Sequence, residues 1–93
     1  MSLHLINSAQ SDSKSIRKFV STDDAIVLLE DGVLHSLLHN PQFNELESIK
    51  LYVVEESLVA RGLKGKQQRM FDLIDYPKLA ELTESFFPII TWY

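Results

Sequence analysis

Short apolar segments alternate with polar, helix-like segments along the whole chain. Five of the apolar segments predict strands, at residues 3–6, 25–29, 50–54, 71–74 and 89–92. The run from Ala25 to Leu29 has no polar interruption, which is typical of a strand buried on both faces. Two carboxylates and a glycine follow it, and an apolar pattern with helical spacing then begins at Val33.

Helical patterns separate the first three predicted strands. Apolar residues at positions 16, 19 and 20 predict a short helix, for which Ser11, Asp12 and Ser13 are candidate N-caps. A second helix is predicted from Val33 to about His39, because the residue before Pro41 disfavours helical geometry. A polar connector at 42–48 leads to the third strand.

Two further helical segments are predicted in the second half of the chain. Residues 55–60 form a brief helical turn, followed by a loop with two glycines. Asp75-Tyr76-Pro77 begins the last helix, since proline suits the first helical position, and Pro88 ends it. Its predicted apolar face consists of Tyr76, Leu79, Ala80, Thr83 and Phe87.

This alternation predicts the α/β class: a three-layer sandwich with a mostly parallel five-stranded sheet, in a single domain over residues 1–93. The helices are few and short for a sheet of five strands. The apolar stretch 89–93 is also costly to leave in water, at about 25 cal/mol per Å². We therefore expect part of the surface to dock onto another subunit.

Composition and net charge exclude several classes of function for this chain. The chain is 45% hydrophobic and 24% charged, as globular domains are, and its net charge of -4 disfavours direct nucleic-acid binding. No apolar run approaches the roughly 18–20 residues of a membrane helix, and no signal-peptide pattern opens the chain. We expect a cytoplasmic protein with no membrane contact. The sequence contains no cysteine, which removes disulfides, thiolate zinc sites and a thiol nucleophile.

Acidic side chains follow most of the predicted strands. In a parallel sheet the carboxyl ends share one rim, which here would carry Asn7, Ser8, Glu30, Asp31, Glu55, Glu56 and Asp75. One interpretation is a magnesium-binding carboxylate cluster. The other is that Asp31-Gly32 is turn chemistry and that the remaining acids complement helix N-termini. No G-x-G-x-x-G or Walker A pattern is present, so no nucleotide or other cofactor is expected.

The remaining candidate chemistry is weak. His35 and His39 have the i, i+4 spacing of a zinc pair but lack further ligands, and we expect no metal site. His4 lies inside a strand and is interpreted as a hydrogen-bonded core or interface residue. No serine lies in a G-x-S-x-G elbow, so no catalytic residue is assigned. The basic stretch Arg61, Lys64, Lys66 and Arg69 is either a solvated loop or a contact for an acidic partner or RNA phosphate.

A family resemblance rests on an ordered set of segments that runs through nearly the whole chain. They are Leu3-His4-Leu5-Ile6-Asn7, residues 24–33, Leu51-Tyr52-Val53, Leu58-Val59-Ala60-Arg61-Gly62-Leu63, Ile74-Asp75-Tyr76 and the near-terminal Trp92. At these spacings the set resembles the TusB/DsrH-like family of sulfur-relay subunits. The resemblance implies a DsrE/F/H-type fold and assembly with TusC-like and TusD-like chains as a dimer of heterotrimers.

The resemblance also implies a role in 2-thiolation of the tRNA wobble uridine. Sulfur would pass as a persulfide from a TusA-like donor to a TusD-like cysteine and on through a TusE-like carrier. A persulfide step needs a thiolate, so this chain is interpreted as a non-catalytic structural subunit with only an indirect link to the carriers and tRNA. The alternatives are a stand-alone enzyme that uses magnesium at the acidic rim and a small adaptor domain.

Within this interpretation, six residues are assigned interface or loop-shaping roles. Glu30, Asp31 and Gly32 are expected to shape a turn. Arg61 and Gly62 are expected to hold a loop, with the arginine free to pair with a carboxylate. Trp92 is the predicted interface anchor, because tryptophan is enriched among binding hot spots.

Overall fold

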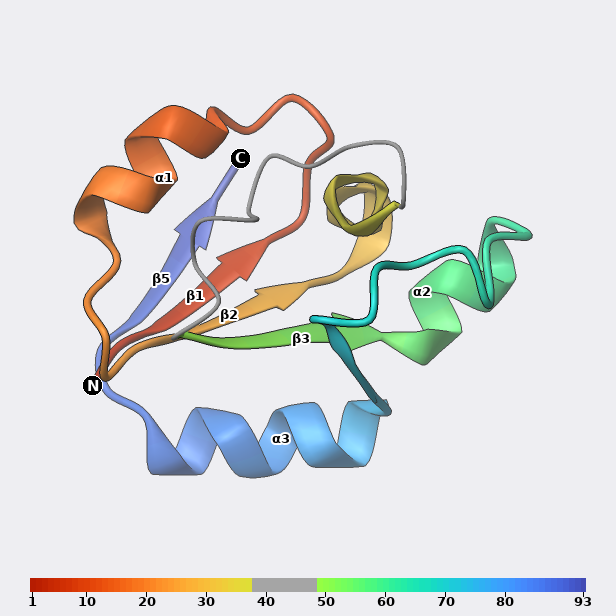
Figure 1. The fold of residues 1–93 in the computed structure, drawn as a ribbon. Helices are drawn as coiled ribbons and strands as arrows, with labels where there is room; N and C mark the ends of the chain where they lie inside the picture. The colour runs from red at the N-terminus through yellow and green to blue at the C-terminus, as the bar shows by residue number, and fades with distance from the viewer. Residues whose placement is uncertain (38–48) are drawn as a thin grey trace.

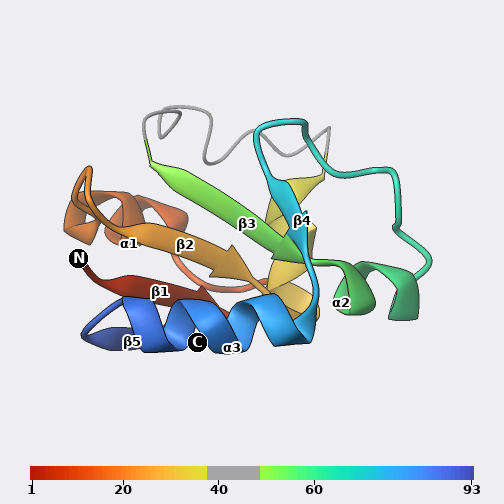
Figure 2. The same cartoon turned by 90° about the horizontal axis from the view of Figure 1, so that it is seen from below.

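The computed structural model describes residues 1–37 and 49–93 and contains one five-stranded sheet (Figure 1). The elements in chain order are β1 (Leu3–Ile6), α1 (Ser13–Phe19), β2 (Ala25–Leu28), the 3-10 helix η1 (Glu30–Ser36), β3 (Lys50–Val54), α2 (Glu55–Ala60), β4 (Asp72–Ile74), α3 (Tyr76–Ser85) and β5 (Ile89–Trp92). The strand order is β4-β3-β2-β1-β5 and all four pairings are parallel (Figure 2).

The sheet is the middle of three layers. In Figure 1, α1 and η1 lie on one side of the strands and α3 lies on the other. The predicted α/β class and three-layer sandwich are therefore confirmed, with a sheet that is wholly parallel. Because every strand runs the same way, the segments that follow the strands emerge along one rim.

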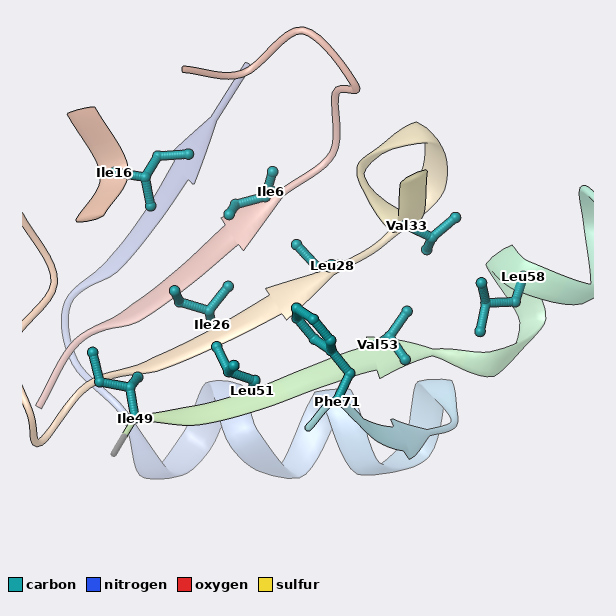
Figure 3. Close-up of a cluster of buried hydrophobic side chains, with 10 residues drawn as sticks. All are labelled: Ile6, Ile16, Ile26, Leu28, Val33, Ile49, Leu51, Val53, Leu58 and Phe71. Atoms are coloured by element: carbon teal, nitrogen blue, oxygen red, sulfur yellow. The ribbon is translucent and has the colours of Figure 1, made fainter. Parts of the chain in front are cut away.

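Each face of the sheet carries its own apolar cluster. On the α1 side, Ile16 of α1, Val33 of η1 and Leu58 of α2 pack over strand residues and Phe71 (Figure 3). On the other side, Leu82 of α3 and the following Phe86 cover the remaining strand residues. The central strand β2 is buried at all four positions, as its unbroken apolar run predicts.

The second predicted helix differs from the structure. A single 3-10 helix, η1, begins three residues earlier than expected, at Glu30, and Leu37 is its C-cap. Glu30 has a left-handed φ of 51°, which turns the chain sharply as it leaves β2. His39, Asn40, Pro41 and the connector at 42–48 lie outside the described residues.

The predicted apolar faces of two helices were partly wrong. In α1 the buried residue is Ile16, whereas the Phe19 side chain is 70% exposed. In α3 the packed face carries Leu79 and Leu82, whereas Tyr76 is exposed; Phe87 lies beyond the end of the helix and is also exposed. The helix starts were predicted well, because Asp12 and Asp75 cap α1 and α3 by accepting backbone N–H bonds.

Candidate functional site

At the rim formed by the carboxyl ends of β2 and β3, the acids at the start of η1 meet the arginine that follows α2. The Arg61 guanidinium at the end of α2 donates from Nε to Asp31 Oδ1 at 2.9 Å, and its Nη2 lies 2.9 Å from the same oxygen as an ion pair. Arg61 Nη2 also lies 3.6 Å from Glu30 Oε2. The acids Glu30 and Asp31 are thus paired with Arg61, which the sequence places 30 residues after Asp31.

Ser57 links η1 and the end of α2 through two hydrogen bonds. Its hydroxyl oxygen accepts the Glu30 amide N–H at 2.9 Å, and its carbonyl accepts Arg61 Nη1 at 3.2 Å. Ser57 is buried, whereas the Arg61 side chain is 27% exposed, so the bond to Arg61 is only partly shielded from competing water. The sequence analysis missed this residue, because a single serine in a helix carries no signal of a long-range contact.

Tyr76 extends the same network to α3. Its hydroxyl donates to Glu30 Oε1 at 3.1 Å, and its amide N–H donates to Glu56 Oε2 at 3.2 Å. Asp75, the N-cap, accepts the Lys78 amide at 2.9 Å. Several acids of the predicted rim therefore serve as caps or pair with neighbouring donors.

Gly32 lies where η1 passes over the end of β1. A Cβ at this position would lie 2.0 Å from the Ile6 carbonyl oxygen, which is part of the backbone and cannot move aside as a side chain can. Gly62 is required for a different reason, since its φ of +67° is left-handed while the space around it is open. At both positions the backbone disfavours a residue with a Cβ, at Gly32 through close approach and at Gly62 through its left-handed φ.

The chemistry available at this rim is limited by its exposure and pairing. Asp31 is 68% exposed, so its bond to Arg61 is an ion pair of the surface type that contributes little to stability. Within residues 1–37 and 49–93, no three His, Asp or Glu side chains come close enough to hold a metal. The same part of the chain encloses no ligand-sized cavity.

A second polar network is buried beneath α1. The Trp92 Nε1–H donates to His4 Nδ1 at 3.0 Å, and His4 Nε2 lies 3.0 Å from Asp24 Oδ2. An indole nitrogen can only donate, so His4 Nδ1 is the acceptor and the proton of the neutral ring is on Nε2, which donates to Asp24. His4 was predicted to be a hydrogen-bonded core or interface residue, and the structure places it in the core with both ring nitrogens bonded.

Asp24 is the centre of this network. The Ser2 amide donates to Oδ1 at 2.8 Å and the Ser21 amide to Oδ2 at 3.0 Å. Burial raises the pKa of Asp24, but these two amides and the His4 ring outweigh it and hold the pKa below its ordinary value of 3.8. The role of Asp24 was not predicted from the sequence, although a histidine within an apolar strand needs a polar partner for its ring nitrogens.

Trp92 is therefore hydrogen-bonded within its own chain and also lies near the surface. Its ring is half-buried, stacks at 6.2 Å from the His4 ring, and lies 5.7 Å from the exposed ring of Phe19. Phe19, at the end of α1, and Trp92, at the end of the edge strand β5, form an apolar surface, the Phe19/Trp92 surface.

Two other predicted candidates, His35 and Lys64, also have partners within the chain. His35 is buried and its Nε2 donates to the Ser8 carbonyl at 3.0 Å, while His39 lies outside the described residues. In the basic stretch, Lys64 Nζ lies 3.6 Å from Glu55 Oε1. In the described segments, no helix has the length and apolar character needed to cross a membrane.

The pH dependence of stability should report on Asp24. Its folded pKa is depressed, so its contribution is present above pH 3.8 and is lost as the pH falls through the folded value. We expect Asp24→Asn to flatten this acid limb relative to the native chain. Urea unfolding measured from neutral pH down to about pH 3 tests this, because this window spans the ordinary carboxyl pKa. An unchanged slope would mean that other carboxylates carry the acid sensitivity.

Comparison with known proteins places this α/β domain in a family. Residues 7–87 match the family model described as DsrH like protein, so the chain belongs to the DsrH-like family. It is 35% identical over 75 residues to Protein TusB of Escherichia coli K12, covering 78% of this chain and 79% of that one. It is 32% identical to Protein TusB of Serratia proteamaculans, covering 89% and 90%.

Solved structures support the fold independently. A protein of unknown function from Methanobacterium thermoautotrophicum, MTH1491, superimposes with a TM-score of 0.75 at 15% identity, covering 97% of this chain and 96% of that one. The YchN protein of Escherichia coli gives a TM-score of 0.72 at 12% identity, covering 98% of both chains. At these identities the likeness shows the fold alone.

Proposed function

We propose that this chain is a non-catalytic subunit of a cytoplasmic sulfur-relay complex that serves 2-thiolation of the tRNA wobble uridine. Its partners would be TusC-like and TusD-like chains, in a heterohexamer. Membership of the DsrH-like family and the relatives named TusB support the relay. TusA-like and TusE-like carriers and tRNA would meet the complex through the other subunits.

The observation that carries the non-catalytic assignment is the absence of cysteine from all 93 residues. Relay of sulfur as a persulfide requires a thiolate that attacks and is then displaced. No other side chain of this sequence forms a persulfide. The transferred sulfur would therefore be carried on thiols of the partner chains, and this subunit would contribute surface and stability to the assembly.

The Phe19/Trp92 surface is the part of this chain that we assign to the partner interface. Phe19 is largely exposed, although a ring of its size gains substantial free energy when it leaves water. Trp92 is held beside it by the bond to His4, so the indole is pre-organised and loses little freedom on binding. A fixed tryptophan beside an exposed phenylalanine matches the composition of binding hot spots.

The loop-shaping residues would act at the carboxyl ends of β2 and β3, on the side of β1 that lies away from β5. Glu30, Asp31 and Arg61 join η1 to α2, while Gly32 and Gly62 set the backbone there. In the proposed complex this network keeps the rim in one shape for a partner. We assign these residues no chemistry of their own.

Substitutions on the Phe19/Trp92 surface test the interface. We expect Trp92→Ala, and separately Phe19→Ala, to weaken co-purification with the TusC-like and TusD-like chains by about tenfold in affinity, the effect of losing roughly 1.4 kcal/mol. The measurement is the yield of the three-chain complex from a tagged TusD-like subunit.

Two controls separate binding from folding. Val59→Ala truncates an exposed apolar side chain on α2 and should leave assembly unchanged. Phe19 is 70% exposed and contacts the ring of the half-buried Trp92, so the thermal stability of Phe19→Ala should stay close to that of the native chain. If Trp92→Ala and Phe19→Ala both co-purify as the native chain does, this surface is not the interface.

A further inference from the structure

The sheet has two edges, and they differ in how well they are protected. The β4 edge is a strand of three residues that includes Asp72 and is flanked by Arg69 and Asp75. Charged residues and short length are the usual means by which edge strands avoid pairing with other chains. The β5 edge is only one residue longer, but it lacks the charged residues, since no charged side chain occurs between Glu84 and Tyr93.

The hydrogen bonds to β1 show which backbone groups of β5 are open. The Leu3 amide donates to the Pro88 carbonyl and the Asn7 amide to the Trp92 carbonyl. Backbone groups alternate along a strand, so residues 88, 90 and 92 face β1, while Ile89 and Thr91 direct N–H and C=O outward and Tyr93 directs its N–H outward. Among the described residues, β1 is the only strand that pairs with β5.

The side chains along this edge are apolar and exposed. Phe87 is 84% exposed and Tyr93 is 83% exposed, and Ile89 is also exposed. Ile89 and Thr91 lie in register with Leu3 and Leu5, which places them on the α3 face of the sheet. Trp92 packs on the α1 face instead, so the Phe19/Trp92 surface and the exposed Ile89 and Thr91 side chains lie on opposite faces of the sheet.

We propose that the β5 edge pairs with β5 of a second copy of this chain, antiparallel and about a two-fold axis at Thr91. A two-fold axis requires that the two strands run in opposite directions. It places Thr91 opposite Thr91 and Ile89 opposite Tyr93, so that every outward-facing residue meets another outward-facing residue. These are hydrogen-bonded pairs, in which each residue donates its N–H to the other's carbonyl.

The side chains along β5 and the lack of charge on this strand also favour a second copy of the chain as the partner of this edge. The Ile89–Tyr93 pairing sets a β-branched residue against an aromatic ring, a cross-strand combination that stabilises antiparallel sheets. Two copies with a net charge of -4 each repel one another, but no like charges face each other across an uncharged strand. The second copy thus satisfies both the open backbone groups and the exposed apolar side chains.

The test is the oligomeric state of the chain on its own, without any partner subunit. Sedimentation velocity from about 10 to 500 µM should show a monomer–dimer equilibrium, since a strand-to-strand contact is smaller than the interfaces of permanent complexes. Thr91→Pro removes an outward N–H and leaves the β1 pairing intact, and it should weaken the dimer by about tenfold or more.

Two further variants keep the test decisive if the proline disturbs folding. Thr91→Lys keeps the backbone donor but places like charges opposite one another at the axis, and it should also weaken the dimer. Thr91→Val keeps both the shape and the donor and should dimerise as the native chain does. In amide hydrogen exchange, the Thr91 amide should gain protection with increasing concentration, whereas the Ile90 amide should be protected at every concentration.

A native chain that stays monomeric throughout this range would overturn the proposal, as would Thr91→Lys and Thr91→Pro variants that dimerise like the native chain. Dimers with exchange protection confined to another element would overturn it too. These readouts do not involve the TusC-like or TusD-like chains, so the outcome is independent of the proposed function.

Discussion

Replacement of Gly32 by alanine should be among the most destabilising single substitutions in this protein. The added Cβ would lie 2.0 Å from the Ile6 carbonyl oxygen, far inside van der Waals contact. Relief requires η1 to move away from the end of β1, which disturbs the packing of the buried Val33. We expect a loss of about 3 kcal/mol in the free energy of unfolding, a large part of the stability of a domain this size.

Gly62→Ala is the matched control for this prediction. Its added Cβ meets no atom within 4 Å, and only the left-handed φ of +67° opposes the substitution. We expect a cost of about 1 kcal/mol, which is the usual penalty for a non-glycine residue in this region. Urea unfolding of both variants decides the matter, and a Gly32→Ala variant as stable as Gly62→Ala would contradict the account of η1.

Removal of the Asp24 side chain should be comparably costly. Asp24→Ala leaves the Ser2 and Ser21 amides and the His4 Nε2–H without an acceptor, in a site where the carboxylate side chain is only 7% exposed. Unpaired buried donors retain their full desolvation penalty. We expect a loss of about 3 kcal/mol at neutral pH, the range found when one partner of a buried pair is deleted.

The neighbouring Asp23 provides the control. It is exposed, so Asp23→Ala should change the free energy of unfolding by less than about 0.5 kcal/mol, as exposed substitutions usually do. The fluorescence of Trp92 gives a second readout, because the indole is bonded to the ring that Asp24 orients. If the fluorescence and stability of Asp24→Ala match those of Asp23→Ala, the buried network has no structural role.

Most of the fold could be predicted because it depends on local signals. Apolar runs located all five strands to within one residue, and the alternation with helices implied parallel pairing. The misplaced second helix has a tertiary cause, since Glu30 takes a left-handed φ and Gly32 is pressed against β1. The face of α3 was misjudged because Leu79 fits both possible apolar stripes, and only packing selects the stripe with Leu82.

The two polar networks depend on contacts between residues far apart in the sequence. The pairing of Arg61 with Asp31 spans 30 positions, and the bond between Trp92 and His4 spans 88. Residue type alone indicated that Arg61 would pair with a carboxylate and that His4 would be hydrogen-bonded. Which partners they find is set by the strand order β4-β3-β2-β1-β5, which brings β5 and the start of β2 to opposite sides of β1.

The assignment of a non-catalytic subunit is tested most directly by following sulfur through a reconstituted complex. The chain is combined with the TusC-like and TusD-like subunits, supplied with persulfide by a TusA-like donor, and analysed by native and then denaturing mass spectrometry. The account predicts one assembly that contains all three chains, with added sulfur on a cysteine-bearing partner and none on this chain. Sulfur bound to this chain, or a chain that never joins the assembly, would contradict it.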